Sequence, residues 1–398
     1  DLITLAGTTA IKSMGGPSLG FCGGRIDDDS GEASLPLGPS EEQRSLFECE
    51  VDGSCKFPFG QTTLGLIYVN PEGPMGNPDP VLSAADIRDS FGRMGFNDTE
   101  TVSLVGGGHA FGKMHGACLE PPCGDGKGPN TYTSGFEGAW STTPTTWSNE
   151  YFKSLINKNF TLVDSPGGPK QWNPTDGTNI VMLTADLAFV SDPSYLALSE
   201  LYAEDLEQLE ADFANSWYRL SSRDMGNYHR CVGDMVPEVQ PWQLPLPLRP
   251  DMAPDTSDVR AGLQKMIDDG EASTAEFARL AFNCASTYRQ TDHLGGCDGA
   301  RIRFSPEKDW EINAGLDATI TKLESIDRGD VSMADTIVLA GYVAIESDGG
   351  YKMDFCSNRV DATAEQAAFT EPLAPRDYYI TTDAKIKDDA AVRGMSIE

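Results

Sequence analysis

The chain has 398 residues, of which 39% are hydrophobic, and its 61 acidic against 30 basic residues give a formal net charge of −31. This length favours two or three domains, and the apolar content is enough for real cores. A chain this negative repels nucleic acid and anionic membrane surfaces, and no run of about 20 apolar residues could span a bilayer, so we expect neither nucleic-acid binding nor membrane insertion.

The first predicted helix covers residues 1–16 and ends at Gly15-Gly16, and its pattern returns at residues 335–350. Ten of the 16 positions are identical at an offset of 334. The register continues in four further pairs, Phe21 with Phe355, Cys22 with Cys356, Arg25 with Arg359 and Asp27 with Asp361. An internal repeat of this kind predicts two homologous domains.

Further helices are predicted where apolar residues recur at helical spacing, at residues 78–112, 195–222, 259–268 and 274–288. Residues 36–64 and 119–180 are rich in turn-forming residues, so mostly loop with short elements is expected there. Residues 237–254 hold six prolines within 18 residues, which is typical of a linker. We therefore expect a mainly α-helical protein with two domains, 1–250 and 251–398.

Nine cysteines are present, an odd number, so at least one thiol is free or pairs outside the chain. No spacing is C-x-x-C, which argues against zinc and thioredoxin-type sites. Cys49 with Cys55, and Cys118 with Cys123, enclose short loops of the kind that a disulfide closes. Together with two Asn-X-Thr glycosylation triplets, the cysteines favour an extracellular or secretory setting, and the absence of a signal peptide predicts a processed or partial chain.

A glycine-rich stretch from Val105 to Gly116 holds His109, one of four histidines, at the end of a helix that residues 97–100 should begin. The glycines would let a second backbone or a flat cofactor approach closely, at a cost in helix stability that suggests a purpose. An imidazole in this place is either an axial ligand to haem iron or a core histidine at a Gly-rich turn. Nucleotide binding is disfavoured, because the spacing is neither a P-loop nor a dinucleotide fingerprint.

Several segments, in their order along the chain, resemble the catalase-peroxidase branch of the class I haem peroxidases. They are residues 65–74, 86–88, 93–94, the His109 stretch, 133–140 and 182–187. The resemblance implies a haem b whose iron is bound by His109, with Asp186 hydrogen-bonded to the other ring nitrogen and Trp140 beside the imidazole. A carboxylate in that place pushes electron density toward iron, and an indole in contact can relay an oxidising equivalent. Taken alone, Asp186 would be read as a surface residue and Trp140 as a core residue.

The resemblance also assigns residues around this trio. Tyr68 and Met94 match two members of a cross-linked Met-Tyr-Trp adduct that supports catalase activity, and Arg223 matches the mobile arginine that serves the adduct. As isolated residues, all three would be assigned packing or surface roles. Contacts to the cofactor are implied for Ile67, Pro71, Leu104, Gly108, Gly112, Lys113, His115, Thr133 and Ser134.

Residues 278–289 of the second domain resemble the family's peroxide-side helix, whose pattern is an arginine, a tryptophan three residues later and then a histidine. Here Arg279 keeps the arginine, but Phe282 and Asn283 replace the other two. An amide cannot titrate near neutral pH, so it cannot perform the acid–base step of the histidine, which is worth roughly 10²–10⁴-fold in rate. We therefore expect residues 251–398 to be a haem-free structural copy.

Both domains are incomplete when compared with the family. The first lacks its own peroxide-side helix, and the second ends before any counterpart of His109. Flanking segments outside the chain, another copy in a homo-oligomer or polymer, or a companion chain would complete each domain.

The cysteines agree with this interpretation. Cys356 has candidate partners in Cys284 and Cys297, on the peroxide-side half of its own domain. Its repeat counterpart, Cys22, lacks that half here, so we expect Cys22 to bond to a segment outside the chain or to another copy.

Two functions of different classes follow. The first is breakdown of hydrogen peroxide at a haem b ligated by His109, with a second peroxide (catalase) or an unknown electron donor (peroxidase) as the reductant. The alternative is an extracellular structural or filament-forming protein built from inactive peroxidase-like domains. Retention of the whole set of matched site residues favours the enzyme, because a purely structural descendant has no physical reason to keep them together.

Overall fold

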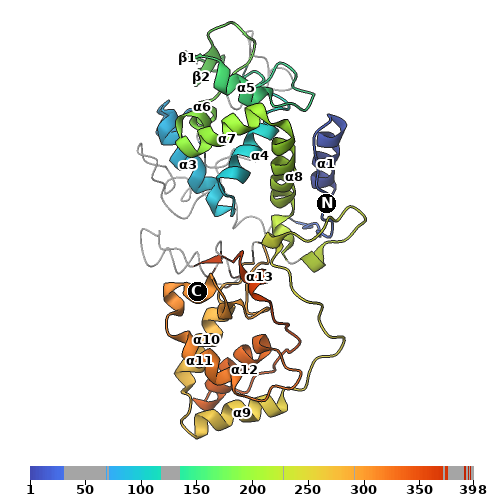
Figure 1. Ribbon diagram of the computed structural model, residues 1–398, viewed down its shortest axis with the longest axis vertical. Helices are drawn as coiled ribbons and strands as arrows, with labels where there is room; N and C mark the ends of the chain where they lie inside the picture. The colour runs from blue at the N-terminus through green and yellow to red at the C-terminus, as the bar shows by residue number, and fades with distance from the viewer. Residues whose placement is uncertain are drawn as a thin grey trace. The chain divides into compact units, whose positions relative to one another are not determined.

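A computed structural model describes residues 1–30, 69, 71–117, 135–226, 228–290 and 292–370, together with isolated positions after residue 370 (Figure 1). The chain divides into two compact units. The first holds residues 1–21 and 25–221, and the second holds residues 22–24 and most of the chain from residue 222 onward. Each unit has its own buried apolar core.

Helices supply nearly all the regular structure of the first unit. They are α1 (Leu2–Ser13), η2 (Pro74–Gly76), α3 (Pro80–Arg93), α4 (Asp98–Gly108), α5 (Glu150–Asn157), α6 (Thr184–Ser191), α7 (Pro193–Glu204) and α8 (Leu206–Ser222). The one sheet among the described residues is an antiparallel pair, β1 (Phe160–Asp164) and β2 (Lys170–Pro174), in which Leu162 lies opposite Trp172. The expected mainly α-helical fold is confirmed.

Local sequence signals explain where these helices begin. Asn97 and Glu100 form a reciprocal capping box at the start of α4, so the helix start predicted at residues 97–100 is confirmed. Asp79 and Asp192 accept backbone N–H groups at the starts of α3 and α7, and each is followed by a proline at the first helical position.

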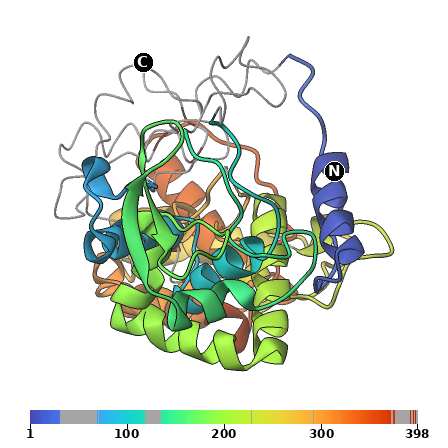
Figure 2. The ribbon, with the colours of Figure 1, turned by 90° about the horizontal axis from the view of Figure 1, so that it is seen from above.

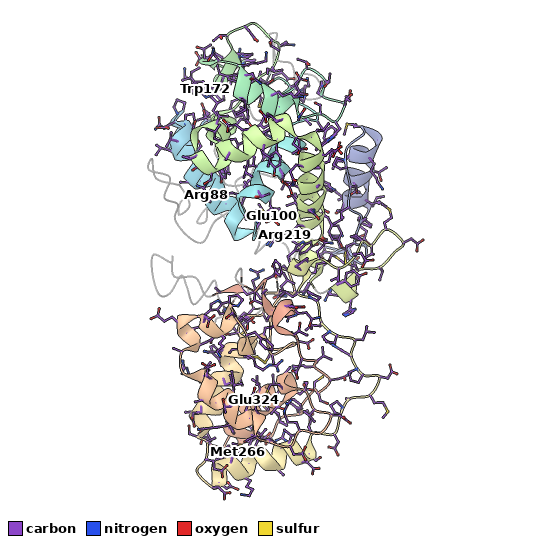
Figure 3. All side chains as sticks on the ribbon, in the orientation of Figure 1. Arg88, Glu100, Trp172, Arg219, Met266 and Glu324 are labelled. Carbon is purple, nitrogen blue, oxygen red and sulfur yellow. A yellow bond between two sulfur atoms is a disulfide. The ribbon has the colours of Figure 1, made fainter. Side chains whose placement is uncertain are left out.

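Ion pairs then tie the starts of α4 and α7 to neighbouring helices. Arg88 on α3 contacts Asp98 at 2.9 Å and Asp192 at 3.0 Å, so one guanidinium links α3, α4 and α7. Arg219 on α8 pairs with Glu100 on α4 (Figure 3). These contacts fix the direction of α4, whose other end bears the candidate ligand.

Helix α1 lies beside α8 (Figures 1 and 2). Trp217 Nε1 on α8 donates to Thr8 Oγ1 at 3.0 Å, and a Cβ at Gly7 would lie 3.1 Å from the Trp217 ring. The helix ends just before Gly15, which has φ +85°, a conformation that favours glycine. The helix predicted for residues 1–16 is therefore confirmed, together with its end at the glycines.

Two glycines of α4 make room for aromatic rings of the core. A Cβ at Gly106 would lie 2.0 Å from Phe152 of α5, and one at Gly107 would lie 2.2 Å from Phe213 of α8. Both rings are buried. The interpretation of the glycines as room for a cofactor is therefore wrong at these two positions, because side chains of the protein fill that space.

The second unit is also helical. Its elements are η4 (Arg223–Met225), η5 (Tyr228–Arg230), η6 (Pro241–Gln243), α9 (Ser257–Asp268), α10 (Thr274–Ala285), η7 (Arg301–Arg303), η8 (Glu307–Asp309), η9 (Glu311–Asn313), α11 (Leu316–Glu324), α12 (Met333–Ser347) and α13 (Ala364–Ala367). Helices α10 and α12 pack closely, since a Cβ at Gly341 would lie 2.5 Å from the Cβ of Ala281. Within the described ranges, neither unit contains a helix with the length and apolarity needed to cross a membrane.

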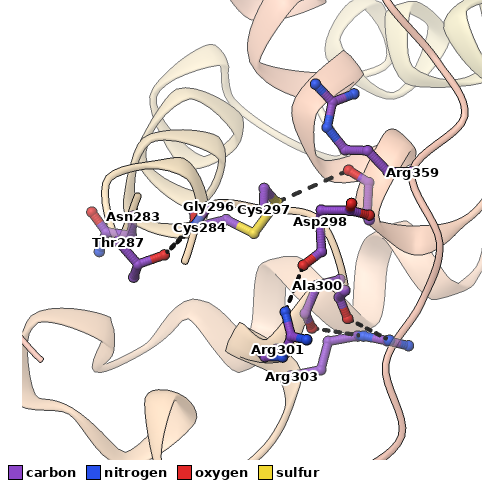
Figure 4. The surroundings of a disulfide bond; sticks show 12 residues. Asn283, Cys284, Thr287, Gly296, Cys297, Asp298, Ala300, Arg301, Arg303 and Arg359 are labelled. Atoms are coloured by element: carbon purple, nitrogen blue, oxygen red, sulfur yellow. Dashed lines mark hydrogen bonds between the residues drawn. A yellow bond between two sulfur atoms is a disulfide. The ribbon is translucent and has the colours of Figure 1, made fainter. Parts of the chain in front are cut away.

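A disulfide joins the end of α10 to the loop that follows it. Cys284 bonds to Cys297, and Figure 4 shows the bridge near Asp298 and Arg301. The Arg301 guanidinium donates to Asp298 O at 2.8 Å. Cys284 and Cys297 bond to each other, so the expectation that one of them pairs with Cys356 is wrong. Cys356 is an exposed thiol with no disulfide partner among the described residues.

A second disulfide joins Cys22 to Cys231, across a sequence separation of 209 residues. The expectation that Cys22 pairs outside the chain is therefore wrong. Residues 22–24 belong to the second unit, which also contains Cys231. Sequence spacing does not reveal this pairing. The other predicted pairs, Cys49 with Cys55 and Cys118 with Cys123, lie outside the described residues.

Candidate active site

Helix α4 delivers His109 to the site. This histidine is the first residue after the helix, with φ −76° and ψ −3°, and its backbone N–H still donates to Val105 O at 2.8 Å. The imidazole therefore projects from backbone that is held in helical geometry, and the side chain is 24% exposed.

The carboxylate of Asp186 faces this imidazole from the first turn of α6. Its Oδ1 lies 3.0 Å from His109 Nδ1, and its Oδ2 accepts the backbone N–H of Leu183 at 2.7 Å. Trp140 Nε1 donates to Oδ2 at 3.0 Å, and the Trp140 ring stacks on the imidazole with centroids 3.9 Å apart and planes 8° from parallel. The fold thus brings together the three side chains that the sequence grouped.

The two ring nitrogens of His109 have different surroundings. Nδ1 is buried at ion-pair distance from Asp186, yet the ring orientation misses hydrogen-bond geometry, so Nδ1 has no hydrogen bond within the described ranges. Because the two atoms are 3.0 Å apart, a small rotation of the ring would align Nδ1–H with Oδ1. No described residue hydrogen-bonds Nε2, and this nitrogen is not enclosed.

Tyr151 on α5 completes the surroundings of Asp186, and sequence analysis missed it. Its hydroxyl donates to Oδ1 at 2.7 Å, and its fully buried ring meets the imidazole edge-on, with centroids 5.3 Å apart. Burial, followed by the negative charge and hydrogen bond of Asp186, raises the pKa of Tyr151 well above its ordinary value. The phenol is therefore a protonated donor at physiological pH. Its one sequence signal, an aromatic residue at helical spacing, usually denotes a core residue.

Short backbone pairings hold the indole against the carboxylate. Met114, which follows α4 closely, exchanges two hydrogen bonds with Gly138 in an isolated antiparallel bridge. Val181 N, in the lead into α6, donates to Ala139 O at 2.8 Å. Trp140 directly follows Ala139. Its backbone is therefore fixed relative to α4, which carries His109, and to α6, which carries Asp186.

Glu137 gathers a second polar cluster on the same loop. Its carboxylate accepts hydrogen bonds from Lys113 Nζ, from His115 Nδ1 at 2.8 Å and from Gly116 N at 3.3 Å. Burial alone would raise the pKa of Glu137, but these hydrogen bonds outweigh burial and lower the pKa below its ordinary value. Lys113 and His115 are predicted cofactor contacts, whereas Glu137 was not singled out, because nothing local in a Phe-Glu-Gly triplet points to it.

Open space flanks His109 along the chain. A Cβ on Gly108 or Gly112 would meet no described atom within 4 Å. Gly112 has φ +67°, which also favours glycine. Open space beside the imidazole and an uncommitted Nε2 are what a flat group bound to that nitrogen requires. The residues present therefore fit a haem whose iron is bound by His109.

The remaining predicted site residues lie in several places. Leu104 is buried in the core of the first unit, and Met94 packs against that core. Pro71 O accepts the backbone N–H of Thr184, at the start of α6, at 3.0 Å. Arg223 belongs to the second unit, where its guanidinium lies 3.9 Å from a carboxylate oxygen of Asp292. Four more predicted residues lie outside the described ones, namely Ile67, Tyr68, Thr133 and Ser134.

On α10 of the second unit, the residues that resemble the peroxide-side helix bind a neighbouring turn. Arg279 Nη2 and Asn283 Nδ2 both donate to Ile312 O, at 2.9 Å and 3.0 Å, and Asn283 Nδ2 also donates to Asn313 Oδ1 at 3.0 Å. Phe282 is 67% exposed. The side chains of Arg279 and Asn283 are thus engaged in holding η9.

Comparisons with known proteins point to one family. The family described as Peroxidase matches residues 1–205 and 259–398. A catalase-peroxidase of Halobacterium salinarum is 41% identical over 92% of this chain and 58% of its own length. Catalase-peroxidases of Natronomonas pharaonis and Pseudomonas entomophila are 41% and 40% identical, over 92% and 94% of this chain. The chain spans 58–60% of the length of these curated relatives.

These relatives correct one expectation and weaken another. Catalase-peroxidases of bacteria and archaea are typically cytoplasmic, so the expected extracellular or secretory setting is wrong. Asn-X-Thr triplets arise often by chance, and a cysteine count alone does not fix a compartment. The alternative of an inactive structural protein finds no support among them.

Proposed function

Because the chain belongs to the peroxidase family, we propose that it takes part in the haem-dependent breakdown of hydrogen peroxide, as a catalase and peroxidase, at a haem b bound by His109. The observation that carries this proposal is the buried Asp186 carboxylate, which contacts the imidazole and the Trp140 indole at once, each at 3.0 Å. When bound, the haem iron supplies the redox chemistry that cleaves the peroxide bond.

The carboxylate of Asp186 would hold the proton of His109 on Nδ1. The Nε2 lone pair is then free to bind iron, and the imidazole gains electron density from its anionic neighbour. Because the carboxylate is buried and anchored at the start of α6, its position does not depend on solvent.

The indole of Trp140 is the proposed route for an oxidising equivalent. Its ring lies parallel to the imidazole at 3.9 Å, close enough for electronic contact. Its N–H donates to a carboxylate, and a negative charge there stabilises positive charge on the indole.

The cofactor contacts are proposed from the same resemblance. Gly108 and Gly112 would face the macrocycle, since a side chain at either position would project into open space. Lys113 and His115, half-exposed and anchored by Glu137, would supply N–H donors to the haem propionates. The remaining proposed contacts are Ile67, Pro71, Leu104, Thr133 and Ser134.

Tyr68, Met94 and Arg223 are proposed to support the catalase half of the reaction. In the family, a cross-linked adduct that includes a tyrosine and a methionine does this, served by a mobile arginine. Met94 directly follows α3, which Arg88 ties to α4. We propose hydrogen peroxide as the substrate with an electron donor as second reductant, and association of the chain in a homo-oligomer or with a companion chain.

We propose further that residues 1–250 and 251–398 are homologous domains, the first haem-binding and the second haem-free. Two parallels at the offset of 334 residues support this. Arg25 pairs with Asp1 at 3.3 Å, and the corresponding Arg359 pairs with Asp335 at 2.8 Å. Helices α1 and α12 both end at a glycine of positive φ, +85° and +87°. The engagement of Arg279 and Asn283 with η9 supports a structural role for the second domain.

The test is haem titration of the protein, with oxygen release from peroxide measured on the same haem-loaded material. We expect a Soret band in the wild-type chain, loss of that band in His109→Gln, and no loss in His229→Gln, a matched change in the other unit. A folded wild-type chain that binds no haem, or a His109→Gln variant that binds it equally well, would overturn the proposal.

A further inference from the structure

We infer that Tyr151 is a positioning residue that shares the negative charge of Asp186 with His109 and so sets how strongly the imidazole donates to iron. This inference rests on the proposed function, since it concerns the same histidine. It assigns a purpose to a phenol that no sequence motif indicated.

Tyr151 and His109 compete for one oxygen atom. The Tyr151 hydroxyl donates to Asp186 Oδ1 at 2.7 Å, and His109 Nδ1 lies 3.0 Å from that same Oδ1. The other oxygen, Oδ2, is already engaged by Trp140 Nε1 and Leu183 N. With both oxygens occupied by other donors, the imidazole receives only part of the carboxylate's accepting capacity.

The surroundings of Tyr151 keep its hydroxyl directed at Asp186. Tyr151 is fully buried on α5, with Phe152 edge-on to it at a centroid distance of 5.2 Å. Within the described ranges Asp186 is its one hydrogen-bond partner, so turning the hydroxyl away would leave a buried donor unpaired.

The geometry also shows which donor has the better bond. The short O–H···O contact to the carboxylate meets hydrogen-bond geometry, whereas the Nδ1 contact lies within reach but is misaligned. Both contacts are made to the same carboxylate oxygen, so the better-aligned O–H···O bond is the stronger of the two. Removing the hydroxyl should therefore strengthen the Nδ1–H···Oδ1 bond and make His109 a stronger donor to iron.

The experiment compares Tyr151→Phe with Tyr202→Phe. Tyr202 is a good control because it is also buried and donates to a carboxylate, Asp212 at 2.8 Å, yet it has no contact with His109 or Asp186 among the described residues. The first measurement needs no haem: the Nδ1–H proton of His109 is observed by NMR in the haem-free chain and assigned with His109→Gln. We expect a downfield shift in Tyr151→Phe and none in Tyr202→Phe.

The second measurement is the reduction potential of the haem-loaded protein. A stronger donor stabilises the oxidised iron, so the potential should become more negative in Tyr151→Phe and stay unchanged in Tyr202→Phe. A downfield NMR shift in a chain that binds no haem would sink the proposed function and leave the charge sharing intact. An unmoved Nδ1–H proton in folded Tyr151→Phe would overturn the charge sharing.

A second probe covers the case in which Tyr151→Phe fails to fold. Biosynthetic replacement of tyrosine by 3-fluorotyrosine keeps the shape of the ring and makes the phenol more acidic, hence a stronger donor. The Nδ1–H proton of His109 should then move upfield, opposite to the Phe variant. A downfield movement, or none, would contradict the inference.

Discussion

Asp186→Asn tests the site most sharply, because the change keeps the shape of the side chain and removes only its charge. Three groups donate to this carboxylate, namely Leu183 N, Trp140 Nε1 and the Tyr151 hydroxyl. An asparagine offers one carbonyl oxygen and one NH₂ group. The oxygen must face Leu183 and Trp140, since neither of these donors can become an acceptor, and the NH₂ group is then turned toward Tyr151 and His109.

The free-energy cost follows from this arrangement. The bonds from Leu183 N and Trp140 Nε1 change from charge-assisted to neutral, and the Tyr151 hydroxyl must accept from the NH₂ group instead of donating to a charged oxygen. At about 1 kcal/mol for each of these three changes, the unfolding free energy should fall by about 3 kcal/mol. The effect on function should be larger. The NH₂ group donates toward His109 Nδ1, so the imidazole proton moves to Nε2 and blocks the nitrogen that would bind iron.

Three measurements on one variant check this reasoning: urea unfolding, the ¹⁵N NMR pattern of the His109 ring, and haem titration. Asp164→Asn is the control, because Asp164 is an exposed carboxylate on β1 whose charge has no part in the site. If Asp186→Asn kept its proton on Nδ1 and bound haem as tightly as the wild type, the argument from hydrogen-bond donors would be refuted.

Four further substitutions have expected outcomes. Gly107→Ala should lower the unfolding free energy, measured with urea, by about 1–3 kcal/mol, because its Cβ would lie 2.2 Å from Phe213. Gly108→Ala should leave stability nearly unchanged but weaken haem binding, because its Cβ would meet no described atom within 4 Å. Equal losses of stability in the two variants would contradict this. Because the pKa of Glu137 is lowered in the folded state, its carboxylate stabilises the fold above the ordinary carboxyl pKa, and this stabilisation is lost as pH falls through the folded-state pKa. The unfolding free energy of Glu137→Gln should therefore fall less with acid than that of the wild type. Parallel curves of unfolding free energy against pH for the two proteins would disprove this. Trp140→Phe keeps a ring against the imidazole but loses the bond to the carboxylate, so it should lose about 1–3 kcal/mol, and an unchanged denaturation midpoint would count against the geometry.

The sequence predicted the features of the fold that local patterns encode, namely where certain helices begin and end. The capping residues Asn97 and Glu100 predicted the start of α4, and the Gly-Gly pairs predicted the ends of α1 and α12. The grouping of His109 with two distant residues came from a resemblance to a known family. Spacing alone did not decide whether this histidine is an iron ligand or a core residue.

The misses have a common physical origin, which is that tertiary contact is not visible in local sequence. Tyr151 looks like any aromatic on an amphipathic helix, and only the fold shows that its hydroxyl reaches a buried carboxylate. The glycines at 106 and 107 have the same local signature as Gly108, yet aromatic rings pack against them. Cys22 finds its partner 209 residues away, a pairing that spacing cannot predict.

The bond from His109 Nε2 to haem iron is the central claim, and pulsed EPR of the haem-loaded protein tests it directly. With ¹⁵N-labelled histidine, the account predicts a strong hyperfine coupling between ferric iron and one histidine nitrogen, absent in His109→Gln and retained in His229→Gln. A spectrum without histidine coupling in the wild type, or one that survives in His109→Gln, would contradict it.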